Sequence, residues 1–150
     1  MIKKTITAVL IVFALFSMKQ AQANELVDLL MSKLGVTELQ ANAGTGVLFK
    51  YLKSQVTGDE FDAVSDAVEG GAGSYMRAAD EAGAYKKTPS KFGKMGSAVT
   101  APGLIGNATE PFKKLGLKGE MITQFADVIV DYFKQKGKEK ATNVFMKMLS

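Results

Sequence analysis

The sequence of 150 residues contains no cysteine, no histidine and no tryptophan, and only three prolines. Without cysteine, no disulfide can stabilise the fold and no lipid can be attached to a thiol, so stability must come from a buried core. Without histidine and cysteine, the chain lacks the usual general base, the usual nucleophile pairs and the usual zinc or copper ligands. Serine hydrolysis of the common kind is therefore excluded, and we expect a non-catalytic protein with no cofactor and no metal site.

The chain also lacks an apolar run of the roughly 20 residues that a bilayer span requires. An unbroken apolar run from Ala8 to Phe16 follows two lysines and precedes Ala21-Gln22-Ala23, which is an A-x-A cleavage site. This arrangement predicts a signal peptide over residues 1–23 and a mature chain that begins at Asn24. We therefore expect an exported protein, periplasmic or extracellular, with no transmembrane span in the mature chain.

Each half of the mature chain is poor in charge of one sign. Residues 24–81 hold ten acids against four bases, and residues 82–150 hold five acids against twelve bases. The full chain has a net charge of +4, but three lysines leave with the signal peptide, which reduces the mature chain to +1. This balance does not support nucleic acid binding, and we expect the oppositely charged halves to attract each other.

Apolar residues recur at intervals of three and four along the mature chain, which predicts helices, and no segment convincingly predicts a strand. Thr37-Glu38-Leu39-Gln40 and Thr57-Gly58-Asp59-Glu60 match the capping box that begins a helix. We expect helices over residues 24–34, 37–56, 57–68, 74–82, 109–115, 118–136 and 138–149. The predicted fold class is all-α, a small multi-helix bundle in which residues 24–150 form a single domain.

The region around Leu34-Gly35-Val36 returns in a weaker form 81 positions later, at Leu115-Gly116-Leu117. The same shift places Val47 on Val128, Leu48 on Ile129, Tyr51 on Tyr132, Leu52 on Phe133 and Lys53 on Lys134. This repeat predicts two related helical units, residues 24–83 and residues 109–150. A long Gly/Pro/Lys-rich connection over residues 84–108 joins them.

The segment Gly44-Thr45-Gly46 has no preceding strand and no lysine in the P-loop position, so it does not predict a phosphate-binding loop. Each interior glycine costs a helix about 1 kcal/mol relative to alanine, and we expect close approach of a neighbouring helix to compensate. Tyr51 and Tyr132 are expected at the rim of the helical core, with their rings buried.

The candidate binding site is the basic start of the connection, because lysines there surround an aromatic residue. An acidic protein, lipid head groups or another anionic surface would suit it, and a solvated loop or docking on the acidic half is the alternative. The acidic group Asp59, Glu60, Asp62, Asp66 and Glu69 lacks the calcium-loop pattern and predicts a solvated helix face. The candidate site residues are Lys86, Lys87, Lys91, Phe92 and Lys94.

Four motifs occur along the chain as one set: Leu34-Gly35-Val36-Thr37-x-x-Gln40-Ala41, the helix leading to Leu48, Phe49 and Leu52, Gly58-Asp59-x-Phe61, and Leu115-Gly116-Leu117 with its following helix. Together these motifs resemble the VcgC/VcgE family of exported bacterial proteins, a domain of unknown function. The resemblance covers about Glu25 to Leu149 and implies no catalytic residue, because the family brings no established activity.

The leading functional hypothesis is a non-catalytic interaction module of the cell envelope. It rests on the missing catalytic residue types, the charged halves and the basic connection. The alternative is a protein that binds lipid or an apolar small molecule, because methionine and phenylalanine are abundant on the predicted helical stripes. A third hypothesis, a glycan hydrolase, requires two carboxyl groups about 5 to 9.5 Å apart across a cleft.

Overall fold

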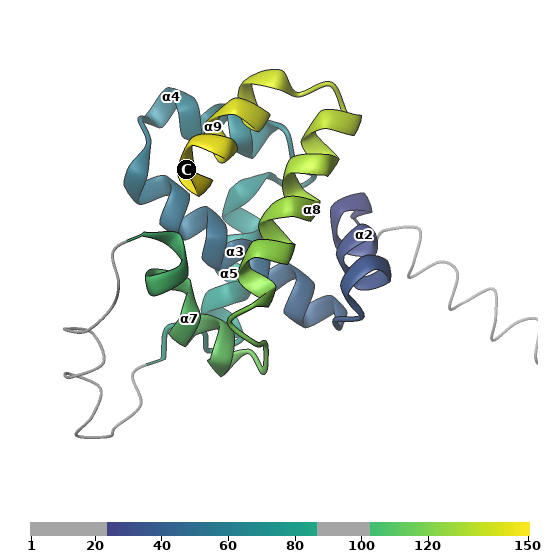
Figure 1. Ribbon diagram of the computed structural model, residues 1–150, viewed down its shortest axis with the longest axis vertical. Coiled ribbons are helices and arrows are strands. Elements are labelled where there is room, and N and C mark those ends of the chain that lie inside the picture. Colours follow the sequence, from purple (N-terminus) through teal and green to yellow (C-terminus); the bar gives the residue numbers. More distant parts are fainter. Residues whose placement is uncertain (1–23, 87–102) are drawn as a thin grey trace, which may run out of the picture.

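The computed structural model describes residues 24–86 and 103–150, and these residues form seven helices without a strand. The predicted all-α fold class is therefore confirmed for the described residues, whereas the predicted signal peptide and residues 87–102 of the connection lie outside them. Figure 1 shows how the helices are arranged. They are α2 (Glu25–Leu34), α3 (Glu38–Gln55), α4 (Gly58–Asp66), α5 (Gly71–Glu81), α7 (Leu104–Lys114), α8 (Met121–Gln135) and α9 (Glu139–Leu149).

Helix α3 lies at the centre of the bundle and contacts each of the other six described helices. Its residues from Ala43 to Phe49 are all buried, and most of them are small. A Cβ atom at Gly46 would lie 1.9 Å from the carbonyl oxygen of Tyr75 in α5, and one at Gly44 would lie 2.6 Å from the ring of Phe125 in α8. The predicted close approach of neighbouring helices to these glycines is confirmed.

Side-chain caps set the beginnings of the first three helices, as the sequence predicts. Asn24 accepts a hydrogen bond from the backbone at the start of α2. Thr37 and Gln40 form a capping box at α3, and Thr57 and Glu60 form another at α4. Each box satisfies two backbone N–H groups that have no partner inside the helix.

The beginning of α5 corrects the sequence prediction. Helix α4 is shorter than predicted, and α5 begins at Gly71, three residues before the predicted Ser74. Gly70 and Gly71 have φ values of 76° and 73°, a left-handed conformation that favours glycine, and they complete the turn over residues 67–70 that separates α4 from α5. The hydroxyl of Ser65 then accepts a hydrogen bond from the amide of Ala72 at 3.0 Å, which satisfies one free donor of the first turn of α5.

The beginning of α7 also differs from the prediction. We expected the connection to extend to residue 108 and a helix to follow from Thr109, but α7 begins at Leu104. Pro111 therefore lies well inside the helix, where it supplies no N–H donor, instead of in the first turn. Leu104 and Ala108 are buried, so apolar burial stabilises the early turns that composition alone predicted to be broken.

A cluster of edge-to-face aromatic rings joins helices from both halves of the chain. The ring of Phe49 in α3 lies 5.5 Å from that of Tyr75 in α5 and 6.2 Å from that of Phe145 in α9. Phe133 in α8 lies 5.9 Å from Phe145. Such pairs contribute about 0.5–1.5 kcal/mol each beyond the burial of their area, so this cluster ties four helices together.

The two halves of the chain pack on each other: α2 contacts α8, α4 contacts α9, and α3 contacts α7. Two ion pairs join acids of the first half to bases of the second. Lys136 pairs with Glu25, and the Lys147 ammonium lies 3.3 Å from a Glu60 carboxylate oxygen. Exposed pairs contribute only about 0–1 kcal/mol each, so apolar packing dominates this interface. The division into two related units stays a prediction.

Candidate functional site: a basic strip where the connection begins

Only one of the five predicted site residues, Lys86, lies in the described part of the chain. It is exposed in the turn that follows α5, and its amide donates a hydrogen bond of 3.1 Å to the carbonyl of Gly83. The other four lie outside the described residues, and their part in the site stays a prediction; they are Lys87, Lys91, Phe92 and Lys94.

A contact with α7 fixes the place where the connection begins. The ammonium group of Lys114 donates a hydrogen bond to the backbone carbonyl of Lys86. Lys113 precedes it in the last turn of α7, where positive side chains are favoured by the helix dipole. Lys86 and Lys114 therefore lie together, with Lys113 next to Lys114 in the chain, and we call these three residues the basic strip.

An aromatic contact extends the positive charge from the basic strip to α3. The ammonium of Lys50 lies 4.3 Å from the ring centre of Tyr85, the neighbour of Lys86, and it also pairs with Asp80. Burial and the nearby Asp80 carboxylate raise the pKa of Tyr85 to about 12, further above neutral pH than the ordinary tyrosine value. A neutral ring suits a cation–π contact, which contributes about 0.5–1 kcal/mol at an exposed site.

Sequence reasoning missed the contribution of α3 and α7 to this positive surface, because Lys50 and Lys114 are distant from Lys86 in the chain. One signal could have indicated Lys113 and Lys114: basic residues in the last turn of the helix that follows the connection. Glu110 is the one acid on α7, and it lies 3.4 Å from Lys113 in an exposed pair. The arrangement can attract an anionic surface, and it offers ammonium donors to it.

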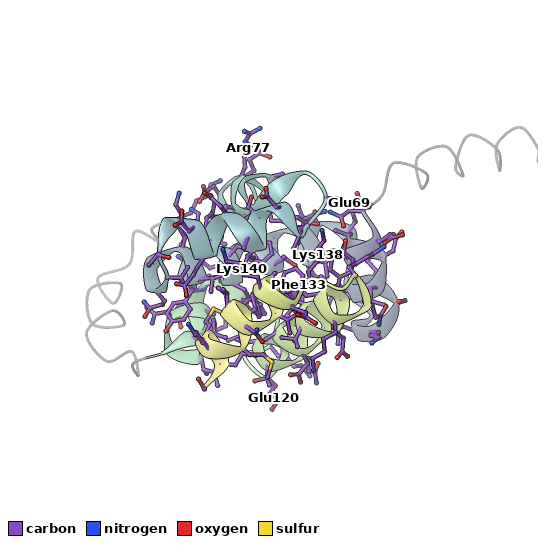
Figure 2. All side chains as sticks on the ribbon, turned by 90° about the horizontal axis from the view of Figure 1, so that it is seen from above. Glu69, Arg77, Glu120, Phe133, Lys138 and Lys140 are labelled. Atoms are coloured by element: carbon purple, nitrogen blue, oxygen red, sulfur yellow. The ribbon has the colours of Figure 1, made fainter. Side chains whose placement is uncertain are left out.

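The acidic group lies mostly on α4, which contacts helix α9. Its half-buried member, Glu60, bonds to the backbone of Thr57 and to Lys147, and these contacts lower the pKa of Glu60. Lys138, which precedes α9, and Lys140 of α9 are labelled in Figure 2. Within residues 24–86 and 103–150, no three acidic, histidine or cysteine side chains gather as metal ligands do. The exposed members are Asp59, Asp62, Asp66 and Glu69.

The two repeated motifs, Leu34-Gly35-Val36 and Leu115-Gly116-Leu117, meet in space. Gly35 and Gly116 both have left-handed backbones, with φ of 66° and 77°. The side-chain amide of Gln40 donates a 3.0 Å hydrogen bond to the carbonyl of Leu115, so the start of α3 is joined to the end of α7. Both motifs line one open hollow of about 410 Å³. The repeat therefore marks a structural junction.

The third hypothesis, a glycan hydrolase, requires a cleft with two carboxyl groups. Three open hollows contain one carboxylate each, which is Asp80, Glu139 or Glu120. A glycan hydrolase of the usual kind needs two carboxylates on opposite sides of the scissile bond, so none of these three hollows supplies that pair.

Tyr51 and Tyr132 were predicted at the rim of the core. Tyr51 is half-buried, whereas Tyr132 is 4% exposed and its ring packs 6.0 Å from that of Phe133. Burial and the nearby Glu69 raise the pKa of Tyr132. Tyr132 is therefore a core residue.

The fold and the site together define an all-helical bundle that is organised around one small-residue helix and carries a basic strip on its surface. The chain belongs to the family described as protein of unknown function VcgC/VcgE, whose sequence profile matches residues 14–150. The resemblance stated from the sequence motifs is thereby confirmed. No curated protein and no solved structure matches the chain. Among the described residues, no helix has the length and apolar character needed to traverse a bilayer.

Proposed function

We propose that this protein is an exported, non-catalytic interaction module of the cell envelope, and that its basic strip and the connection bind an acidic protein partner. The single observation that carries the proposal is the Lys114 bond to the carbonyl of Lys86. It holds the start of the basic connection against the basic end of α7. Residues 82–109 contain four lysines and no acid, so the connection adds positive charge to the strip. Clustered charge of one sign speeds the association with a partner of opposite charge and selects for it.

Capture of partners from an envelope extract tests the proposal. The first variant changes Lys86, Lys87, Lys91 and Lys94 to glutamate. The matched control changes four exposed lysines elsewhere to glutamate, so that both variants alter the net charge equally; they are Lys118, Lys134, Lys138 and Lys140.

We expect the first variant to lose the captured partner and the control to retain it. Adding Lys113→Glu to the wild type tests the helical part of the strip, and we expect weaker capture that recovers at low salt. Equal capture by all variants would remove the basic site from the proposal, and an absence of any captured protein would contradict the interaction module.

Export is the other part of the proposal, and the pattern of lysines, apolar run and A-x-A site supports it. Amino-terminal sequencing of the protein from periplasmic and culture fractions is expected to begin at Asn24. Recovery only from the cytoplasm, with Met1 retained, would contradict export.

A second candidate function, contact with a lipid surface, is favoured by one specific observation. It concerns the start of α7 and the end of α9, which Figure 1 shows in green and yellow. These two segments carry large exposed apolar side chains: Ile105 is 59% exposed, Met146 is 47% exposed and Leu149 is 39% exposed. Apolar side chains near lysines suit the surface of an anionic bilayer.

Flotation with vesicles that contain anionic phosphatidylglycerol, or only neutral phosphatidylcholine, tests the second candidate. Binding is expected only with the anionic vesicles, and Ile105→Ser with Met146→Ser should abolish it. Leu39→Ser is a matched control, because Leu39 is 61% exposed on α3. If the protein fails to float with either vesicle, and native mass spectrometry finds no bound lipid, the lipid hypothesis is wrong.

A further inference from the structure

An open groove lies between the second half of α3 and helix α5, with a volume of about 500 Å³. Gly73 helps to keep it open, because nothing lies within 4 Å of the position that a Cβ atom would take there. The residues that line it are Lys50, Lys53 and Ser54 from α3, and Gly73, Met76, Arg77 and Asp80 from α5.

The groove gathers positive charge in the acidic half of the chain. Residues 24–81 contain ten acids and only four bases, and three of these four bases line the groove. Asp80 is the one carboxylate among the lining residues. Asp80 compensates one of the three cations, so the groove keeps a net positive charge that a bound anion would neutralise.

The three cations have different partners. Lys50 is occupied, since it pairs with Asp80 and lies over the ring of Tyr85. The ammonium of Lys53 lies 5.6 Å from the ring centre of Phe61, a contact that leaves its hydrogen-bond donors free. Arg77 makes no ion pair within the described residues and stands out at one edge of the molecule in Figure 2.

We propose that this groove binds the oxyanion group, phosphate or carboxylate, of a small organic molecule. Arg77 supplies a planar donor fork that matches two oxygen atoms of either group, and Lys53 supplies a second positive charge. The half-buried side chain of Met76 offers an apolar contact to the rest of the molecule. This inference goes beyond the proposed interaction module, because no residue of the basic strip lines the groove.

The test is a ¹H–¹⁵N NMR titration of the purified protein with inorganic phosphate, and separately with acetate, at constant ionic strength set by chloride. We expect saturable shifts of the amides of Ser54 and Gly73 and of the Arg77 side chain. Tighter binding of phosphate identifies a phosphoryl ligand, and equal or tighter binding of acetate identifies a carboxylate; either result supports the groove.

Two variants separate the groove from general surface charge. Arg77→Ala removes the fork and should weaken binding about tenfold or more, as expected for loss of a bidentate charge-assisted pair. Gly73→Leu fills the groove without changing any charge, and it should abolish saturation while helix content by circular dichroism is kept. Lys140→Ala, on α9, removes one positive charge elsewhere and should leave the titration unchanged.

Shifts that never saturate with either anion would overturn the proposal, and so would saturation that survives both Arg77→Ala and Gly73→Leu. Capture of an acidic protein through the basic strip does not depend on Arg77. Failure of the groove therefore leaves that function standing, and failure of partner capture leaves the titration unaffected.

Discussion

Gly46 and Thr45 are neighbours in α3, and both are fully buried, but their surroundings constrain them differently. Gly46 has no space for a side chain, because the carbonyl of Tyr75 occupies the position where one would begin. The hydroxyl of Thr45 has no hydrogen-bond partner among the described residues. A buried hydroxyl without a partner lowers stability, so one residue is required by its packing and the other can be improved.

Replacing Gly46 with alanine is expected to lower the free energy of unfolding by about 3 kcal/mol or more, because α3 and α5 must separate to admit a methyl group. Gly73→Ala is the matched control. It lies inside α5 with nothing within 4 Å of its Cβ position, so the same change should raise stability by about 1 kcal/mol. Urea unfolding of both variants measures the difference, and equal effects would refute the role of close packing.

Thr45→Val keeps the shape of the side chain and removes the unpaired hydroxyl, so we expect a gain of about 1 kcal/mol in the free energy of unfolding. Thr142 provides the comparison, because its buried hydroxyl donates a 2.9 Å hydrogen bond to the carbonyl of Lys138. Thr142→Val should therefore lower stability by about 0.5 to 1 kcal/mol. Thermal unfolding of both variants checks the prediction. An equal loss of stability in Thr45→Val and Thr142→Val would contradict it.

At the scale of helices, the two capping boxes differ in their charge. The box at α3 uses the neutral amide of Gln40, whereas the box at α4 uses the carboxylate of Glu60. The bond to the backbone of Thr57 and the contact with Lys147 lower the pKa of Glu60. A lowered pKa in the folded state means that the carboxylate stabilises the fold at pH values above the unfolded pKa.

This linkage predicts how Glu60→Gln changes stability with pH. The difference in unfolding free energy between wild type and variant should be complete at pH 7, and it should shrink as the pH falls below about 4.3, the unfolded value of a glutamate. Gln40→Ala is the control, because its cost should be the same at pH 7 and pH 3. Urea unfolding over this range checks both, and a difference for Glu60→Gln that does not change with pH would exclude the linkage.

Sequence patterns predicted the helices well where a cap marks an end. The boxes at Thr37 and Thr57 and the glycines at positions 35, 116 and 137 lie where the predicted helices begin or end. The predictions failed at α5 and α7, which begin earlier than expected. In both cases local composition favours a break, but the tertiary contacts of Ala72 and Leu104 stabilise the first turn.

At the scale of the whole molecule, the halves of the chain share one core. The aromatic cluster includes α3 and α5 from the first half and α8 and α9 from the second, so neither half buries its apolar surface alone. We expect differential scanning calorimetry to show one cooperative transition, because removing either half exposes the core of the other.

The same reasoning applies to fragments. Residues 24–86 and 103–150, which keep every described helix whole, are expected to lack stable tertiary structure when they are expressed separately, as judged by poor dispersion of their amide NMR signals. Mixing the two fragments should restore the dispersion at low salt better than at high salt, because the halves carry opposite charge. Two separate calorimetric transitions, or a folded isolated half, would show instead that the repeat marks independent units.

The sequence by itself determined the helical class, the capped helix ends, the family and the need for close packing at Gly44 and Gly46. The helical class and the capped ends depend on local hydrogen bonding and on apolar periodicity, which residues close together in the chain specify. Only the tertiary structure decided which lysines meet, because Lys50, Lys86 and Lys114 come from separate segments that packing brings together. The groove beside Arg77 has the same origin, since it exists only where α3 and α5 pack side by side.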